Sequence, residues 1–236
     1  MSNRTQADRM FETLRAEILA CRFLPGSKLR ISDIAETSEV SLGAVREALS
    51  RLGAEGLVIA ESQKGYRVAS ISVEDLQDLT EARVEIERIA LARSIARGDL
   101  EWETNLVAAW HRLSRISRPD AGDVADQWPL AHGVFHEALV KACGSAKLLQ
   151  VRSQLYQQTE RYRRYSGVVD KERDVFGEHQ RIFDATIARD SPAALTAIAE
   201  HLRLTAEIIA GSLKLEREGA EGSRPAVDSP KTAAAK

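Results

Sequence analysis

Apolar residues recur at helical spacing along almost the whole chain, and this periodicity constrains the fold more than any other feature. One such stripe, spaced i, i+3, i+4 and i+7, consists of Val45, Ala48, Leu49 and Leu52. It predicts a helix over residues 42–55. A convincing strand signal occurs at one place, GLVIAESQKGYRVASIS (residues 56–72), where two short apolar runs flank a polar turn and indicate a β-hairpin. The predicted fold class is therefore mainly α.

The elements before residue 70 follow the order of a winged helix-turn-helix. A first helix ends before the turn at Pro25-Gly26, and a short helix over residues 32–37 follows. The helix at 42–55 and the hairpin complete the set, so residues 1–69 are predicted to form one domain. Such a module places its third helix in the major groove of DNA. Winged helices also serve as protein-docking modules, which is the alternative.

Several polar residues of this domain are candidates for DNA contact. Arg46 lies on the outward face near the start of the third helix, where a guanidinium suits a bidentate contact with guanine. The candidates for phosphate, backbone or minor-groove contact are Lys28, Ser41, Lys64, Gly65 and Arg67. The formal net charge of the chain is −2, so bulk charge does not nominate DNA as a partner. The prediction that this domain binds DNA therefore depends on the positions of these residues and not on the net charge.

Three runs in this domain, FLPGSKLR, VSLGAVREALSRLGAEGLV and QKGYRVA, resemble the DNA-binding domain of GntR-type bacterial transcription regulators over residues 10–69. The resemblance implies a winged helix-turn-helix that binds operator DNA. The chain departs from the family pattern at Leu42-Gly43-Ala44, where the family often has Arg-Thr-Pro. It also departs at Ser32, where the family often has an arginine, with Arg30 nearby as a substitute. Leu42, Gly43 and Arg30 are further candidate DNA contacts, and the identity of the bases stays open.

The chain has five histidines, and two of them, His132 and His136, lie four residues apart on an apolar helix face. His179 and His201 lie on the inward faces of two later helices. Each is 11 residues from Asp190, which lies in the turn between them. In an antiparallel helix hairpin both would lie roughly 16 Å from that turn, at the same height. Four inward histidines predict a cage for a divalent metal ion, zinc or nickel. Hydrogen-bonded core histidines are the alternative.

Arg83 lies on an inward helical stripe, where an unpaired guanidinium is costly to bury. An ion pair with Glu87, one turn later, would satisfy its charge. The functional alternative is a fork for the carboxylate of a small organic acid that acts as effector. Arg161 and Tyr165, spaced i and i+4 in the run RYRRY, are predicted to reach the same cavity. Most of that run suits a solvated basic face.

The segments DLTEARVEIERIAL, FHEAL, EHQRIFD and EHL, between about residues 73 and 215, resemble the all-helical FCD effector domain of the FadR branch of GntR regulators. Many family members bind a metal through an aspartate, a histidine four residues later and two further histidines. The resemblance implies that His136, His179 and His201 are metal ligands, and it supports a carboxylate-binding role for Arg83.

His132 stands where the family pattern has the aspartate. Either the metal then keeps an uncompensated charge that favours an anionic ligand, or His132 does not coordinate. Three further segments, GSKLRI, QKGYRVASIS and ACGS, resemble one sub-branch of the family, the carbon-starvation-type regulators that respond to glutarate-like acids. The resemblance therefore implies a short carboxylic acid as the effector.

The chain is accordingly predicted to be a ligand-responsive repressor of a catabolic operon, acting as a homodimer in the cytoplasm. An effector-binding domain over residues 72–217 would follow the DNA-binding domain, and residues 218–236 would form a disordered tail. No segment predicts a membrane helix or a leader. The two cysteines, Cys21 and Cys143, fit no metal or redox spacing.

Two other classes of protein compete with this prediction. A metal-dependent hydrolase or lyase could use the same histidines, but it needs a carboxylate beside them. Glu137 and Glu178 each directly neighbour a histidine, so on a helix they point about 100° away from it. A pure protein-interaction module would leave Arg46 and the hairpin residues Lys64-Gly65 without a purpose.

Overall fold

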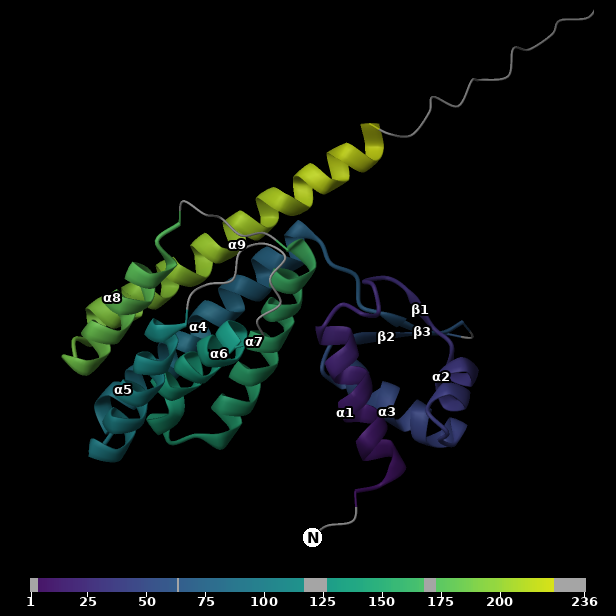
Figure 1. Cartoon of the computed structure of the whole chain (residues 1–236), viewed down its shortest axis with the longest axis horizontal. Helices are drawn as coiled ribbons and strands as arrows, with labels where there is room; N and C mark the ends of the chain where they lie inside the picture. The colour runs from purple at the N-terminus through teal and green to yellow at the C-terminus, as the bar shows by residue number, and fades with distance from the viewer. Residues whose placement is uncertain (1–3, 63, 117–126, 168–172, 223–236) are drawn as a thin grey trace, which may run out of the picture.

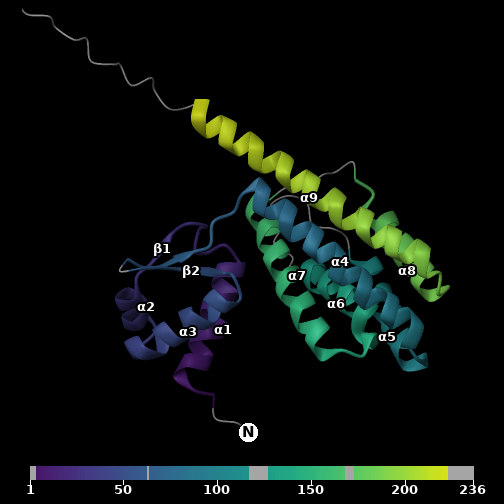
Figure 2. The same cartoon turned by 180° about the vertical axis from the view of Figure 1, so that it is seen from behind.

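The computed structural model describes residues 4–62, 64–116, 127–167 and 173–222. Figure 1 shows an N-terminal domain of three helices and a small sheet, joined by a linker to a helical domain. The predicted fold class, a winged helix-turn-helix followed by an all-helical domain, is confirmed. Figure 2 shows from behind that helix α9 (Ser191–Gly222) continues well past the other helices of its domain.

The N-terminal domain contains the helices α1 (Gln6–Leu19), α2 (Ile31–Thr37) and α3 (Leu42–Ala54). Hydroxyl caps fix the start of two of them: Thr5 accepts a hydrogen bond from the Asp8 amide, and Ser41 accepts one from the Ala44 amide. The apolar stripe predicted for the third helix is fully buried and consists of Val45, Ala48, Leu49 and Leu52. The opposite face of α3 is therefore left to solvent.

A three-stranded sheet completes this domain, with strands β1 (Lys28–Leu29), β2 (Val58–Glu61) and β3 (Gly65–Val68) in the order β1-β3-β2. The predicted hairpin is β2 and β3. Gly65 begins β3 with φ of +94°, a conformation that other residues rarely adopt. The sequence does not predict β1, because it has two residues and pairs Lys28 with the distant Arg67.

In the helical domain, α4 (Val73–Arg97) packs against most of the other helices. The other elements of the domain are α5 (Leu100–Arg115), α6 (Gln127–Val140), the 3-10 turn η1 (Lys141–Cys143), α7 (Ala146–Ser166), α8 (Val175–Ile187) and α9. Of these, α6, η1, α7 and α9 pack against α4, while α5 packs on α6 and α8 packs on α9. The helix breaks predicted at Gly98-Asp99, Gly144-Ser145 and Asp190-Ser191 are confirmed. Among the residues described, no helix is both long and apolar enough to span a membrane.

The last helix extends beyond the predicted end of its domain. Helix α9 runs to Gly222, so the domain end predicted at residue 217 falls inside a helix rather than at its end. The rest of the predicted tail, residues 223–236, lies outside the described residues, as does the helix break predicted at Arg118-Pro119-Asp120. The helical pattern weakens after residue 217, and for this reason the apolar period alone did not mark the end of α9.

Helix α7 contacts both domains. Arg161 is buried and donates from Nη1 to the Ala69 carbonyl at 3.0 Å and from Nη2 to the Ser70 carbonyl at 3.1 Å. Gln158 donates to the Glu55 carbonyl, the residue that follows α3, at 2.8 Å. The prediction that Arg161 reaches the effector cavity is therefore corrected: its guanidinium holds the linker between the two domains.

Candidate functional site

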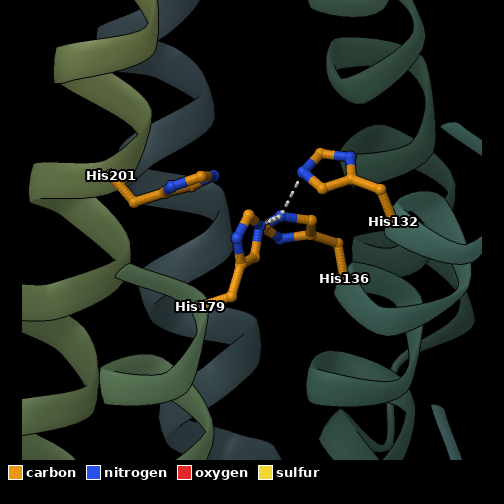
Figure 3. A group of neighbouring side chains, drawn as sticks. All are labelled: His132, His136, His179 and His201. Carbon is orange, nitrogen blue, oxygen red and sulfur yellow. Dashed lines mark hydrogen bonds between the residues drawn. The ribbon is translucent and has the colours of Figure 1, made fainter. Parts of the chain in front are cut away.

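Four histidine side chains meet in the interior of the helical domain (Figure 3). His132 and His136 come from α6, His179 from α8 and His201 from α9, and all four are buried. One ring nitrogen from each lies within 4.8 Å of the others. The predicted level placement of the last two is confirmed, since the ring centres of His179 and His201 are 4.4 Å apart.

Aromatic packing sets the spacing between α6 and α8, which supply three of these histidines. Trp110 of α5 lies between them, with ring centres 5.6 Å from Phe135 and 5.4 Å from Phe183. Phe135 directly precedes His136 and is fully buried, so α6 has little freedom to rotate. The indole of Trp128 stacks on the His132 ring at 4.6 Å, which fixes the other end of the pair.

The nitrogen geometry fits a metal ion. His136 Nε2 lies 3.1 Å from His132 Nε2 and 3.2 Å from His179 Nε2. Two imidazole nitrogens that bind one tetrahedral zinc at about 2.0–2.1 Å lie roughly 3.3 Å apart. A single shared proton can satisfy only one such nitrogen pair, whereas a cation satisfies all the lone pairs at once. The donor set therefore suits zinc or nickel.

The histidines are also in the protonation state that metal ligation requires. Burial lowers the pKa of His132 and of His136 well below the usual range, and the neighbouring histidines lower both further. Burial also lowers the pKa of His201, and it lowers the pKa of His179 to about 3. All four rings are therefore neutral near pH 7, so they offer lone pairs without first losing protons.

Outer hydrogen bonds orient two of the rings. His179 Nδ1 donates to the Val175 carbonyl at 2.7 Å, and His201 Nδ1 donates to Glu178 Oε2 at 2.7 Å. Such contacts fix the tautomer and leave Nε2 for a metal. By contrast, Nδ1 of His132 and of His136 has no hydrogen-bond partner within the part of the chain that the structure describes. His132 relies on its stacking contact with Trp128 instead.

The position of Glu178 corrects the sequence analysis. The prediction considered only its neighbour His179 and placed the carboxylate away from the site, but Glu178 is buried and binds His201 on α9. Arg173 donates hydrogen bonds to both carboxylate oxygens of Glu178, at 2.7 and 2.6 Å. Burial would raise the pKa of Glu178, but the hydrogen bonds from Arg173 and His201 outweigh it and lower that pKa to about 2. Glu137 is exposed and pairs with Lys141.

Arg83 points inward as predicted and is 3% exposed. Its Nε lies 3.5 Å from Glu87, which confirms the ion pair but leaves that nitrogen without a hydrogen-bond partner among the described residues. Arg152, which the sequence pattern did not predict at this site, binds the same carboxylate at 2.9 Å. Both guanidiniums also lie against the ring of Tyr156, each with its central carbon 4.9 Å from the ring centre. Two buried cations thus share one carboxylate.

A small cavity joins the arginine to the histidines, with a free volume of about 40 Å³. Its polar lining comes from Arg83, His132, Thr159, Glu160, Arg163, Arg173, His201 and Thr205. A larger groove of about 570 Å³ between α5 and α6 is lined by none of the four histidines. The candidate effector site is therefore identified by its lining residues and not by its volume. Tyr165, predicted to reach the cavity, is 36% exposed and is not among its lining residues.

Most of the predicted DNA-binding residues are exposed on the N-terminal domain. Arg46 lies on the exposed face of α3, and the other exposed candidates are Lys28, Arg30, Ser41, Leu42, Gly43 and Lys64. Gly65 is half-buried at the hairpin turn. Arg67 is less available than predicted, because it donates to Glu61 at 2.8 Å and to the Gly26 carbonyl at 3.1 Å.

A winged helix with an exposed third helix, joined to a helical domain with a buried histidine cluster, is the architecture of a DNA-binding regulator with a ligand-sensing domain. Residues 6–68 match the family described as bacterial regulatory proteins, gntR family, and residues 78–204 match the FCD domain. The chain belongs to the GntR family of bacterial transcription regulators and carries an FCD domain. GntR regulators bind operator DNA, and FCD domains commonly bind a metal and a small-molecule effector.

Relatives and solved structures agree with this assignment. The HTH-type transcriptional regulator BphR of Paraburkholderia xenovorans is 38% identical over 87% of this chain and 86% of its own length. The HTH-type transcriptional repressor GlaR of Escherichia coli is 38% identical over 84% and 93%. The structure of E. coli McbR/YncC shares the fold, with a TM-score of 0.72 at 18% identity over 89% of this chain and all of that one. The chain is a transcription regulator and not a metal-dependent enzyme.

Proposed function

We propose that this regulator is a repressor that binds a two-fold operator as a homodimer and releases it when a small organic acid enters the cavity. The observation that carries the proposal is the buried positive charge beside the histidine cluster: Arg83 and Arg152 both pair with the one carboxylate of Glu87 in the described structure. An anion that entered the cavity would balance this charge. The description of GlaR as a repressor supports the direction of control.

We propose that His136, His179 and His201 hold one zinc or nickel ion, with His132 as the fourth ligand. Such an ion supplies a Lewis-acidic position for an anion. Because four neutral imidazoles replace a set that includes a carboxylate in many relatives, the ion keeps its full charge. The chain's own residues orient the rings and keep them neutral: Glu178 fixes His201 and Trp128 stacks on His132.

The same charges indicate the class of effector. A carboxylate suits Arg83, whose Nε lacks a hydrogen-bond partner in the described structure, and a second carboxylate suits the cationic metal site. A short dicarboxylic acid of the glutarate type would satisfy both ends. The free volume of about 40 Å³ requires the lining side chains to move before such a ligand enters. Arg163, which pairs with Glu160 in the wall of the cavity, is the side chain that we expect to move.

The deciding experiment is a gel-retardation assay with full-length protein and duplexes from the region upstream of its own gene. We expect retardation in the absence of ligand and release on adding one of a panel of short mono- and dicarboxylic acids. Protein treated with a chelator and then reloaded with zinc or nickel tests whether release needs the metal. If no duplex is retarded, the operator-binding function is wrong; if retardation persists with every acid, the effector class is wrong.

A further inference from the structure

Helix α3 presents a leucine to solvent at the end that a recognition helix inserts into DNA. Leu42 is the first residue of α3 and is 50% exposed. The other exposed residues of its first turns are Gly43, Arg46 and Glu47, so Leu42 is the apolar member of a surface that is otherwise polar or bare. An apolar side chain there gains free energy only if a partner removes it from water.

Leu42 and Arg46 lie one turn apart on the same face of α3. Side chains at i and i+4 have Cβ atoms about 5–6 Å apart. Successive base pairs are about 3.4 Å apart along each strand. If Arg46 reaches the edge of a guanine, Leu42 therefore reaches an adjacent base pair, or the one beyond it.

The surroundings of Leu42 leave room for a base edge. Gly43 has no side chain, and a Cβ atom placed on it would meet only the Ser41 hydroxyl oxygen, at 3.9 Å. That hydroxyl already accepts the Ala44 amide hydrogen at 3.2 Å as the helix cap. Leu42 itself cannot read a base by hydrogen bonding, because its side chain has no donor or acceptor.

One base offers the apolar group that such a side chain fits. In the major groove, thymine presents a C5 methyl group beside its O4 acceptor, while adenine, guanine and cytosine present hydrogen-bonding atoms and no methyl group. A leucine methyl packed against that group buries apolar surface on both sides. A guanine or cytosine at the same place would leave its polar edge facing the leucine and lose hydrogen bonds to water.

We propose that Leu42 selects a thymine in each half-site by contact with its C5 methyl group, close to the base pair that Arg46 contacts. The inference rests on the proposed function, since it requires α3 to be the recognition helix. It goes further by assigning a base to a position where the chain departs from the Arg-Thr-Pro pattern common in its family. Specificity at that position is apolar rather than ionic, so it does not weaken as salt is raised.

The test uses full-length protein and a duplex selected from a random-sequence library by that protein. Each thymine of the selected duplex is replaced in turn by uracil, which removes the methyl group and keeps every hydrogen-bonding atom. We expect one thymine per half-site at which the replacement weakens wild-type binding about fourfold, the equivalent of one buried methyl group. Leu42→Ala should bind the original duplex more weakly and be insensitive to uracil at that position.

Leu100→Ala is the matched control, because Leu100 is also the exposed first residue of a capped helix, at 78% exposure, but lies on α5 in the other domain. It should retain wild-type affinity and wild-type sensitivity to uracil. If Leu42→Ala keeps the wild-type sensitivity to every uracil replacement, or if the wild type has none, the thymine contact is wrong and α3 can still be the recognition helix. If the wild type selects no duplex from the library, the proposed function itself is wrong.

Discussion

Glu178 accepts a hydrogen bond from Nδ1 of His201 at 2.7 Å, although the two residues lie on different helices and Glu178 directly precedes another histidine of the cluster. The contact makes Glu178 an outer partner of the proposed metal site. We expect Glu178→Gln to lower zinc affinity by about 10- to 100-fold, because the amide no longer raises the basicity of the ring. Titration against a competing chelator measures this. The control is Glu137→Gln, which also neighbours a histidine but is exposed; an equal loss in both variants would exclude an outer role for Glu178.

The four histidines should not contribute equally to metal binding. His136 is central, since its Nε2 contacts the nitrogens of both His132 and His179. We expect His136→Ala to abolish the rise in melting temperature that zinc produces in the wild type. His132→Asp should retain the metal while weakening the response to an anionic effector, because the charge of the site falls by one. Elemental analysis and thermal denaturation decide; wild-type protein that neither contains nor is stabilised by zinc or nickel would contradict the metal site.

Stability of the metal-free protein should fall as the solution is acidified. Burial, followed by repulsion from His201 when that ring is protonated, lowers the pKa of His179 to about 3, so below its ordinary value the unfolded chain binds a proton that the folded chain does not. The free energy of unfolding then falls with falling pH, by about 1.4 kcal/mol per pH unit for each such histidine, over a window from roughly pH 6.5 down to 3. Urea denaturation at several pH values measures the slope. His179→Gln should make it shallower, and an equal slope in this variant would contradict the assignment.

Arg83→Met should separate effector sensing from DNA binding. The substitution keeps much of the side-chain length and removes the cation, while Arg152 still pairs with Glu87 at 2.9 Å, so the fold should survive. We expect this variant to retard operator DNA normally and to lose release by carboxylic acids. Arg203→Met is the control, since Arg203 forms an exposed pair with Glu81 on the surface of the same domain. Normal release by the Arg83 variant would show that the arginine serves only its ion pair.

Two substitutions in the N-terminal domain should weaken DNA binding in different ways. Arg46→Ala should cost about 1–3 kcal/mol and relax specificity at one position of each half-site. Lys28→Ala should weaken binding to all sequences alike and reduce the slope of affinity against salt concentration by about one. Retardation assays over a range of salt concentrations distinguish the two. Unchanged operator affinity in Arg46→Ala would rule out α3 as the reading helix.

The sequence predicted the elements whose evidence is local. The apolar stripe of α3, the turn at Gly65 and the equal spacing of His179 and His201 from Asp190 are all visible in short stretches of residues, and the structure has each of them. Contacts between distant segments were missed. β1 is two residues long and exists because β3 pairs with it.

Side-chain partners from distant helices account for the remaining errors. Helical spacing placed Arg161 near Tyr165, but it could not show that the linker carbonyls at Ala69 and Ser70 lie closer to its guanidinium than the cavity does. In the same way, helical spacing identified Glu87 as the partner of Arg83. It gave no sign of Arg152, which lies 65 residues after Glu87 in the chain. The buried pairing of two arginines with one carboxylate was therefore visible only in the folded protein.

Helix α7 carries Tyr156, which lies against Arg83. Two residues later Gln158 donates to the DNA-binding domain, and five residues later Arg161 donates to the linker. Arg161 follows Tyr156 by five positions, a rise of roughly 7.5 Å along the helix at 1.5 Å per residue. Suppose that an acid bound at Arg83 moves this helix and so lowers the affinity of the protein for operator DNA. Bound operator must then lower the affinity of the protein for the acid by the same factor. The acid concentration that half-saturates the free protein is then lower than the concentration that releases the protein from half of the operators.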